Sequence, residues 1–195
     1  MVRKSTAPAR TAPHEIRIIG GTWKRTRLPV LDRPGLRPTP DRVRETLFNW
    51  LGHDLAGWRC VDAFAGTGAL GLEAASRGAA DVLLVESEGV LVDQLRAIVK
   101  RLAADNVRIQ RGNALSVLAA LPPASIDAVF LDPPFDSQLF DKALAAARGA
   151  LAPAGFVYLE APLQWEDEAL ARHGLQLTRH LKAGAVHGHL LRPVA

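Results

Sequence analysis

The sequence predicts an α/β fold with a mostly parallel sheet of seven strands, and three observations support this prediction. From residue 59 onward, apolar strand-like runs alternate with segments of helical periodicity, as a parallel sheet requires. A glycine-rich turn follows the first of these strands, and an acid-Pro-Pro-aromatic turn follows the fourth. The last two runs follow each other without a helix, so we expect an antiparallel closing strand.

The composition is that of one folded domain. The chain has 195 residues, of which 48% are hydrophobic, and this is enough for a single core. No apolar run approaches the roughly 20 residues of a membrane-spanning helix. The single cysteine, Cys60, excludes an intrachain disulfide and a cysteine cluster for zinc. We therefore expect a monomeric cytoplasmic protein without a membrane segment or a bound metal ion.

The net charge of +4 conceals an uneven distribution. Residues 1–44 contain eleven Lys and Arg but three Asp and Glu, whereas the remainder is mildly acidic. A basic amino-terminal region indicates a polyanionic partner, and nucleic acid is the usual one. A solvated basic face without a partner is the alternative. We expect residues 1–14 to be a flexible basic tail and residues 15–52 to contact RNA.

Residues 16–28 predict a β-hairpin, with two short strands around a Gly-Gly turn at residues 20–21. Alternation in the second strand would place basic side chains and an aromatic ring on one face, as phosphate contact and base stacking require. The predicted RNA-binding residues of this segment are Arg17, Trp23, Lys24, Arg25 and Arg27.

A helix follows the hairpin. Thr39 can cap it, with Pro40 at its first position, and apolar residues then recur at helical spacing up to Leu51. Three arginines, Arg37, Arg42 and Arg44, lie at or near its start. We expect them to contact RNA or substrate, and a role in solubility is the alternative.

The remainder of the chain supplies the sheet and its covering helices. Strand-like runs lie at about residues 59–64, 81–86, 107–110, 126–132, 155–160, 175–181 and 186–191. Helices are expected between most of them, at about residues 89–102, 137–151 and 165–172 among others. Ligands bind at the carboxyl ends of the strands in open α/β sheets, so these ends hold the candidate site.

The loop after the first strand is of the type that binds nucleotides. Gly66, Gly68 and Gly71 form the pattern G-x-G-x-x-G between a strand and a helix, where glycines allow a ligand close to the backbone. Nicotinamide-dependent enzymes share this pattern. Asp62 precedes the first glycine by four residues, where a carboxylate suits the ammonium of an amino acid and would repel a pyrophosphate. Asp62 therefore favours an adenosyl amino acid.

Polar residues also follow the next two strands. Glu86 ends the second strand, where a carboxylate can accept hydrogen bonds from both hydroxyls of a ribose. Asn113 and Ala114 follow the third strand and are placed to meet the edge and face of an adenine. The predicted cofactor-binding residues are Asp62, Phe64, Gly66, Gly68, Glu86, Ser87, Asn113, Ala114 and Asp132.

The turn Asp132-Pro133-Pro134-Phe135 closes the fourth strand abruptly. Neither proline can donate to a sheet ladder, so the backbone leaves the sheet at Asp132. A carboxylate, backbone carbonyls and an aromatic ring are thereby left at the ligand-binding edge. The alternatives are a rigid turn with a helix cap, and core packing of Phe135.

Several segments together resemble known methyltransferases. Asp62-Ala-Phe-Ala-Gly-Thr-Gly, Glu86 and Asp132-Pro-Pro-Phe are similar to S-adenosylmethionine-dependent enzymes that act on exocyclic amino groups. A closer resemblance is to the bacterial 16S rRNA guanine-N2 methyltransferase family. It is carried by Arg17-Ile-Ile-Gly-Gly-Thr-Trp-Lys, Arg37-Pro-Thr-Pro-Asp-Arg-Val-Arg-Glu-Thr-Leu-Phe-Asn and Leu70-Gly-Leu-Glu-Ala-Ala-Ser-Arg-Gly-Ala. The resemblance covers about residues 15 to 160 and weakens after Glu160.

This resemblance implies a Rossmann-like class I methyltransferase fold. Residues 53–195 would bind S-adenosylmethionine, and the amino-terminal hairpin and helix would be a small extension. The implied substrate is the exocyclic N2 amino group of a guanine in 16S rRNA, within an assembling or assembled 30S subunit. The catalytic residues would then be Asp132, Pro133, Pro134 and Phe135.

The residues of the turn suggest how an amine could be held. The Asp132 carboxylate and the Pro133 carbonyl could accept its two N–H bonds, and Phe135 could stack on an unpaired or flipped base. Adenine N6 of DNA or RNA is an alternative target, because the turn suits either amine. A nicotinamide-dependent oxidoreductase and a noncatalytic RNA-binding module are the alternatives from other functional classes.

Overall fold

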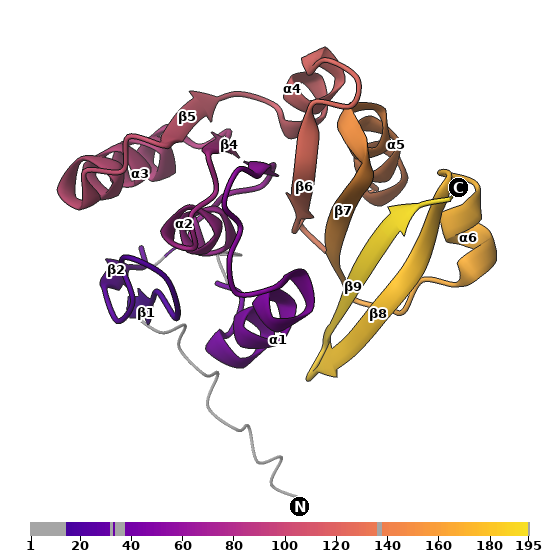
Figure 1. The fold of residues 1–195 in the computed structure, drawn as a ribbon, viewed down its shortest axis with the longest axis horizontal. Coiled ribbons are helices and arrows are strands. Elements are labelled where there is room, and N and C mark those ends of the chain that lie inside the picture. The colour runs from indigo at the N-terminus through magenta and orange to yellow at the C-terminus, as the bar shows by residue number, and fades with distance from the viewer. Residues whose placement is uncertain (1–14, 32, 34–37, 136–137, 195) are drawn as a thin grey trace, which may run out of the picture.

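The computed structural model describes residues 15–31, 33, 38–135 and 138–194 (Figure 1). One sheet contains seven strands in the order β5-β4-β3-β6-β7-β9-β8. Their bounds are β3 (Arg59–Asp62), β4 (Asp81–Glu86), β5 (Val107–Arg111), β6 (Ile126–Leu131), β7 (Leu151–Ala161), β8 (Leu175–Ala183) and β9 (Val186–Pro193). All neighbours pair in parallel except those of β9, which is antiparallel to β7 and β8. The predicted mostly parallel sheet with an antiparallel closing strand is confirmed.

Helices cover both faces of this sheet (Figure 1). Their bounds are α1 (Asp41–Leu51), α2 (Ala69–Ser76), α3 (Gly89–Leu102), α4 (Ala114–Ala120), α5 (Phe140–Ala150) and α6 (Asp167–Ala171). Helices α1, α2 and α3 share one apolar cluster with the amino-terminal strands β1 (Glu15–Arg17) and β2 (Arg27–Pro29). Helices α4, α5 and α6 share the other. None of the helices in the described part of the chain is long and apolar enough to cross a membrane.

The central strands are buried on both faces, which explains their continuous apolar sequences. Along β6, Ala128 and Phe130 enter the cluster under α1 and α2, whereas Val129 and Leu131 enter the cluster under α4 and α5. Side chains alternate along a strand, so the residue after Leu131 returns to the α1 side.

The amino-terminal segment differs from the predicted hairpin. β1 pairs with β2 in antiparallel fashion, but residues 18–26 between them contain turns, so the prediction of a Gly-Gly turn and a strand over residues 22–28 is wrong. We call residues 18–26 the docked loop, because α2 holds it. The Ser76 carbonyl accepts from Thr22 N at 2.7 Å, and the Ser76 hydroxyl donates to the Gly20 carbonyl at 2.6 Å. At Gly21 φ is +74°, and a Cβ there would overlap the Ser76 carbonyl.

The carboxylate of Glu73 in α2 also holds the docked loop. Its side chain is fully buried and accepts hydrogen bonds at 2.8 Å from Ile19 N, Gly20 N and Arg77 Nε. Arg44 Nη1 lies 3.4 Å from Oε2, the oxygen that also accepts from Ile19 N. The glycines at residues 20–21 therefore serve close packing on α2 rather than a hairpin turn.

Helix α1 begins one residue later than predicted. Pro40 is the N-cap residue, not the first helical residue, and no side chain caps this end. The Thr39 side chain is buried and hydrogen-bonds the Glu160 carboxylate near the end of β7. The start of α1 is thus fixed to the end of β7.

Candidate active site

Three carboxylates gather at the carboxyl ends of neighbouring strands. Asp62 ends β3, Asp132 directly follows β6, and Glu160 is next to last in β7. Each lies two residues after a side chain in the cluster under α1 and α2, namely Cys60, Phe130 and Tyr158. Because side chains alternate, the three carboxylates face the same side of the sheet.

Asp62 is 2% exposed, and its Oδ2 accepts a hydrogen bond from Gly71 N at 2.9 Å. Burial raises the pKa of this carboxyl to about 7 against the effect of that hydrogen bond, and the charges of Glu86 and Glu160 raise it further. A buried acid of this kind gains from a cationic neighbour. The predicted position of Asp62 beside the glycine loop is confirmed.

The glycine loop makes a tight turn into α2. Gly66 has φ +51°, and Gly68 is the left-handed N-cap of the helix with φ +77°. A Cβ at Gly68 would lie 2.7 Å from a methyl carbon of Leu95. The amide of Gly66 donates to Glu86 Oε2 at 2.9 Å, so the end of β4 holds the loop after β3.

The remaining predicted cofactor residues lie along the same edge. Glu86 Oε1 accepts from Ser87 N at 2.7 Å, and each carboxylate oxygen has two lone pairs, so Oε2 can accept a further hydroxyl. Asn113 Oδ1 accepts from Ser116 N at 3.1 Å, which makes it the cap of α4, a role that we did not predict. Ala114 is buried, whereas Phe64 is partly buried against the α4 side of the sheet.

The turn after β6 presents both polar and aromatic groups. Burial raises the pKa of Asp132 well above its usual range, and the charges of Glu160 and Asp62 raise it further. Pro133 is buried and Pro134 is exposed. Phe135 is 37% exposed, which contradicts core packing and leaves its ring available to a ligand.

Glu160 is a site residue that we did not predict. Its side chain is 3% exposed, and its carboxylate accepts hydrogen bonds from Tyr158 Oη, at 3.1 Å, and from Thr39. Burial raises the pKa of Glu160 to about 7, while these two donors and the charge of Arg44 oppose that rise. Strand alternation could have indicated it, since an acid at the end of a buried strand adjoins the Asp132 turn.

The structure contradicts one predicted RNA contact. Arg44 is fully buried, with Nη2 donating to Asp41 Oδ1 at 2.6 Å and to the Arg17 carbonyl at 2.9 Å. A guanidinium enclosed in this way cannot reach a phosphate. Arg44 instead joins α1 to β1 and, through Glu73, to α2.

The other predicted RNA-binding residues are exposed or lie at the surface, although not on one strand face. Lys24 and Arg25 are exposed in the docked loop, where Arg25 has φ 71°, and Trp23 is partly buried against the core. Arg17 pairs with Asp41 at 2.9 Å and Arg27 with Glu15 at 3.1 Å, both at the surface. Arg42 is exposed on α1, and Arg37 lies outside the described residues.

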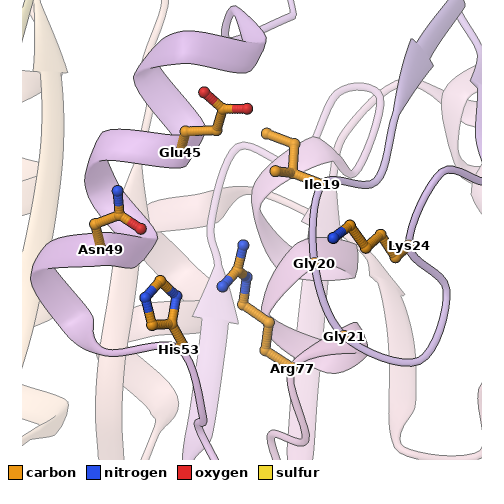
Figure 2. A pocket seen from close by; sticks show the side chains of 8 residues that line it. All are labelled: Ile19, Gly20, Gly21, Lys24, Glu45, Asn49, His53 and Arg77. Carbon is orange, nitrogen blue, oxygen red and sulfur yellow. The ribbon is translucent and has the colours of Figure 1, made fainter.

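A cavity of about 390 Å³ lies between the docked loop and α1. Figure 2 shows the side chains of Lys24, His53 and Arg77 directed toward its centre from three segments. Arg77 is 8% exposed, and its Nε is paired with Glu73. The cavity is lined by Ile19, Gly20, Gly21, Lys24, Glu45, Asn49, His53 and Arg77.

Comparison with known proteins identifies the family. The model described as Conserved hypothetical protein 95 matches residues 16–192. Ribosomal RNA small subunit methyltransferase D of Escherichia coli K12 is 46% identical over 160 residues, which are 80% of each chain. Its Haemophilus influenzae counterpart is 40% identical over 154 residues, 76% of this chain and 80% of the relative. The chain belongs to this methyltransferase family.

A solved structure agrees with the assignment. The yhhF protein of Escherichia coli is 42% identical, with a TM-score of 0.79 over 93% of this chain and 99% of that one. The resemblance found in the sequence is confirmed, as is the Rossmann-like class I methyltransferase fold. Among the described residues, no group of three or more His, Cys, Asp and Glu side chains could hold a metal ion.

Proposed function

We propose that this protein transfers a methyl group from S-adenosylmethionine to the exocyclic N2 amino group of a guanine in 16S rRNA. The observation that carries the proposal is the position of the Asp132 turn at the same sheet edge as Asp62 and the glycine loop. Membership of a family whose relatives are named as small-subunit rRNA methyltransferases supports the choice of substrate.

The residues of this edge fit S-adenosylmethionine. Asp62 has one oxygen bound to Gly71 N, and its second oxygen can accept the ammonium of the cofactor's amino acid. Glu86 can accept from the ribose hydroxyls, and Asn113 retains its amide N–H groups for an adenine. The raised pKa of Asp62 indicates a site that favours a cationic ligand. When bound, S-adenosylmethionine supplies an electrophilic methyl group attached to a positively charged sulfur.

The Asp132 turn would position the amine. The Asp132 carboxylate and the Pro133 carbonyl accept hydrogen bonds from its two N–H groups, which directs the nitrogen lone pair out of conjugation with the ring and toward the methyl group. Carboxylate charge also stabilises the positive charge that develops on nitrogen. The exposed ring of Phe135 stacks on the base, which must be unpaired or flipped to enter.

RNA would be held along the docked loop and the start of α1. Lys24, Arg25 and Arg42 are exposed there, and the cavity in Figure 2 adds the cationic Arg77 at its base. Phosphate contacts of this kind fix orientation without reading sequence. We place the substrate within an assembling or assembled 30S subunit and the protein in the cytoplasm as a monomer.

The test is to map methylation of 16S rRNA from a strain that lacks the gene, by nuclease digestion and mass spectrometry. We expect one N2-methylguanine to disappear and to return when the purified protein and S-adenosylmethionine are added to 30S subunits or naked 16S rRNA. Loss of an N6-methyladenine instead would assign the alternative amine. An unchanged methylation map would refute the proposed function.

A further inference from the structure

Glu160 lies beside the carboxylate that the proposed function assigns to the amine. Leu131 of β6 pairs with Leu159 of β7, so the next residues along these parallel strands, Asp132 and Glu160, are neighbours. Adjacent strands lie about 5 Å apart, and alternation directs both side chains to the α1 side. Burial is the largest cause of the raised pKa of Asp132, and the charge of Glu160 comes next, ahead of that of Asp62.

Hydrogen-bond donors surround the Glu160 carboxylate. Tyr158 Oη donates at 3.1 Å and Thr39 donates from the segment before α1. On the other side, β9 presents Gly188 opposite Glu160. A Cβ at Gly188 would lie 2.7 Å from Tyr158 Oη, so the glycine leaves the space that this hydroxyl needs.

Methyl transfer leaves one proton in excess on the amine. The nitrogen gives its lone pair to the methyl carbon, the carbon–sulfur bond breaks with its electron pair on sulfur, and one N–H bond then breaks with its pair on nitrogen. Asp132 is placed to receive that proton. Two adjacent carboxylates repel each other, which favours uptake of one proton by the pair, and such a pair titrates in coupled steps rather than as two separate residues.

We propose that Glu160 is a positioning residue that shares with Asp132 the proton released from the target amine. This inference rests on the proposed function. The pair starts doubly ionised beside the cationic methyl donor and ends with one proton and one negative charge. The net charge of the site is unchanged, because the sulfur loses its positive charge in the same step. The proton is released to solvent after the methylated product has dissociated.

Every group that faces Glu160 bears on its titration. These groups are Asp132, which follows the neighbouring strand β6, Asp62 at the end of β3 one strand further on, Tyr158 from its own strand, Arg44 from α1, and the Thr39 hydroxyl. The two carboxylates favour proton uptake by Glu160, whereas Arg44 and the two hydroxyls oppose it. Strand β9 contributes no charge at this position, because its residue there is Gly188.

The test compares pH profiles of kcat for methyl transfer in Glu160→Gln and Tyr158→Phe. In Glu160→Gln, Asp132 loses a like-charged neighbour, so the acid limb should move to lower pH by about one unit or more. In Tyr158→Phe, Glu160 loses a donor to its ionised form, so the acid limb should move to higher pH. Glu168→Gln, an exposed carboxylate on α6, is the matched control and should leave the profile unchanged.

A second measurement uses the protein without cofactor. Carbon-13 NMR of the side-chain carboxyls should show Asp132 titrating in two coupled steps, and in one step at lower pH in Glu160→Gln. Equal loss of activity at every pH in Glu160→Gln, with an unmoved profile and a one-step titration of Asp132 in the unsubstituted protein, would overturn the inference. If the unsubstituted protein methylates no rRNA at any pH, the proposed function fails, and the NMR titration still decides whether the pair exists.

Discussion

Replacing Glu73 with Gln should release the docked loop from α2. The Glu73 carboxylate is fully buried and is the common acceptor for two backbone amides of the loop and for two arginines. The Gln side chain has the same size, but one carboxylate oxygen is replaced by an NH₂ group. This group is a donor, so it cannot accept the hydrogen bonds that the oxygen accepts from N–H groups in the native protein. Arg44 and Arg77 would also lose their shared buried counter-charge.

The expected cost follows from the burial of this network. Removing one partner of a buried ion pair destabilises a protein by about 3–5 kcal/mol, because a buried charge is left uncompensated. Total stability is typically about 5–15 kcal/mol, so the loss is a large fraction of it. For a chain of this size each kcal/mol lowers Tm by roughly 2–4 °C, which gives a decrease of about 6–20 °C for Glu73→Gln.

Urea unfolding followed by circular dichroism measures the loss, and hydrogen exchange locates it. We expect the amides of Ile19 and Gly20 to lose protection in Glu73→Gln, because both donate to the carboxylate at 2.8 Å. The exposed Glu88 supplies the control variant, Glu88→Gln, which should leave both amides protected. A loss below about 1 kcal/mol with unchanged protection would show that Glu73 does not hold the loop.

Three further predictions concern the docked loop, RNA binding and pH. Gly21→Ala should lower the free energy of unfolding by at least about 1–2 kcal/mol, because φ is +74° and a Cβ would meet a backbone carbonyl. The control is Gly57→Ala, where φ is +82° but the surrounding space is open, and it should lose less. Equal losses in the two variants would disprove the packing role of Gly21. Arg25→Glu with Arg27→Glu should weaken rRNA binding and reduce its salt slope by about 2 in a filter-binding titration, whereas an unaltered slope would mean that neither residue contacts phosphate. Burial lowers the pKa of His189 to about 4. In the unfolded chain this histidine is protonated at a higher pH, near 6.5, than in the folded protein, so the free energy of unfolding should fall as the pH drops from about 6.5 to 4. In His189→Gln this dependence should be weaker in urea unfolding at several pH values, and identical dependences would contradict the assignment.

Much of the fold could be predicted because its signals are local. Residues 81–86 form a strand with the predicted bounds, since burial on both faces makes the segment continuously apolar. The helix at residues 89–102 was equally predictable from its apolar periodicity. Asp62, Glu86 and Asp132 could be placed together because each follows a strand of one parallel sheet, and the carboxyl ends of such strands share an edge.

The errors arose where distant contacts decide the structure. Gly20 and Gly21 have the sequence of a hairpin turn, but their backbone is positioned by Ser76, more than fifty residues away. Arg44 resembles a surface arginine at the start of a helix, and only the tertiary fold encloses it beside Glu73. Glu160 belongs to no local sequence motif, because its role depends on Asp132, which follows the neighbouring strand.

The most direct test of the amine clamp is a comparison of methyl transfer and cofactor affinity in Asp132→Ala. Methyl transfer to 16S rRNA should fall by at least about 10²-fold, because the amine loses a positioned charged acceptor in the transition state. Calorimetric affinity for S-adenosylhomocysteine should stay nearly unchanged, since Asp62 and Glu86 remain in place. Unimpaired methyl transfer, or loss of cofactor binding in parallel with activity, would contradict the role assigned to Asp132.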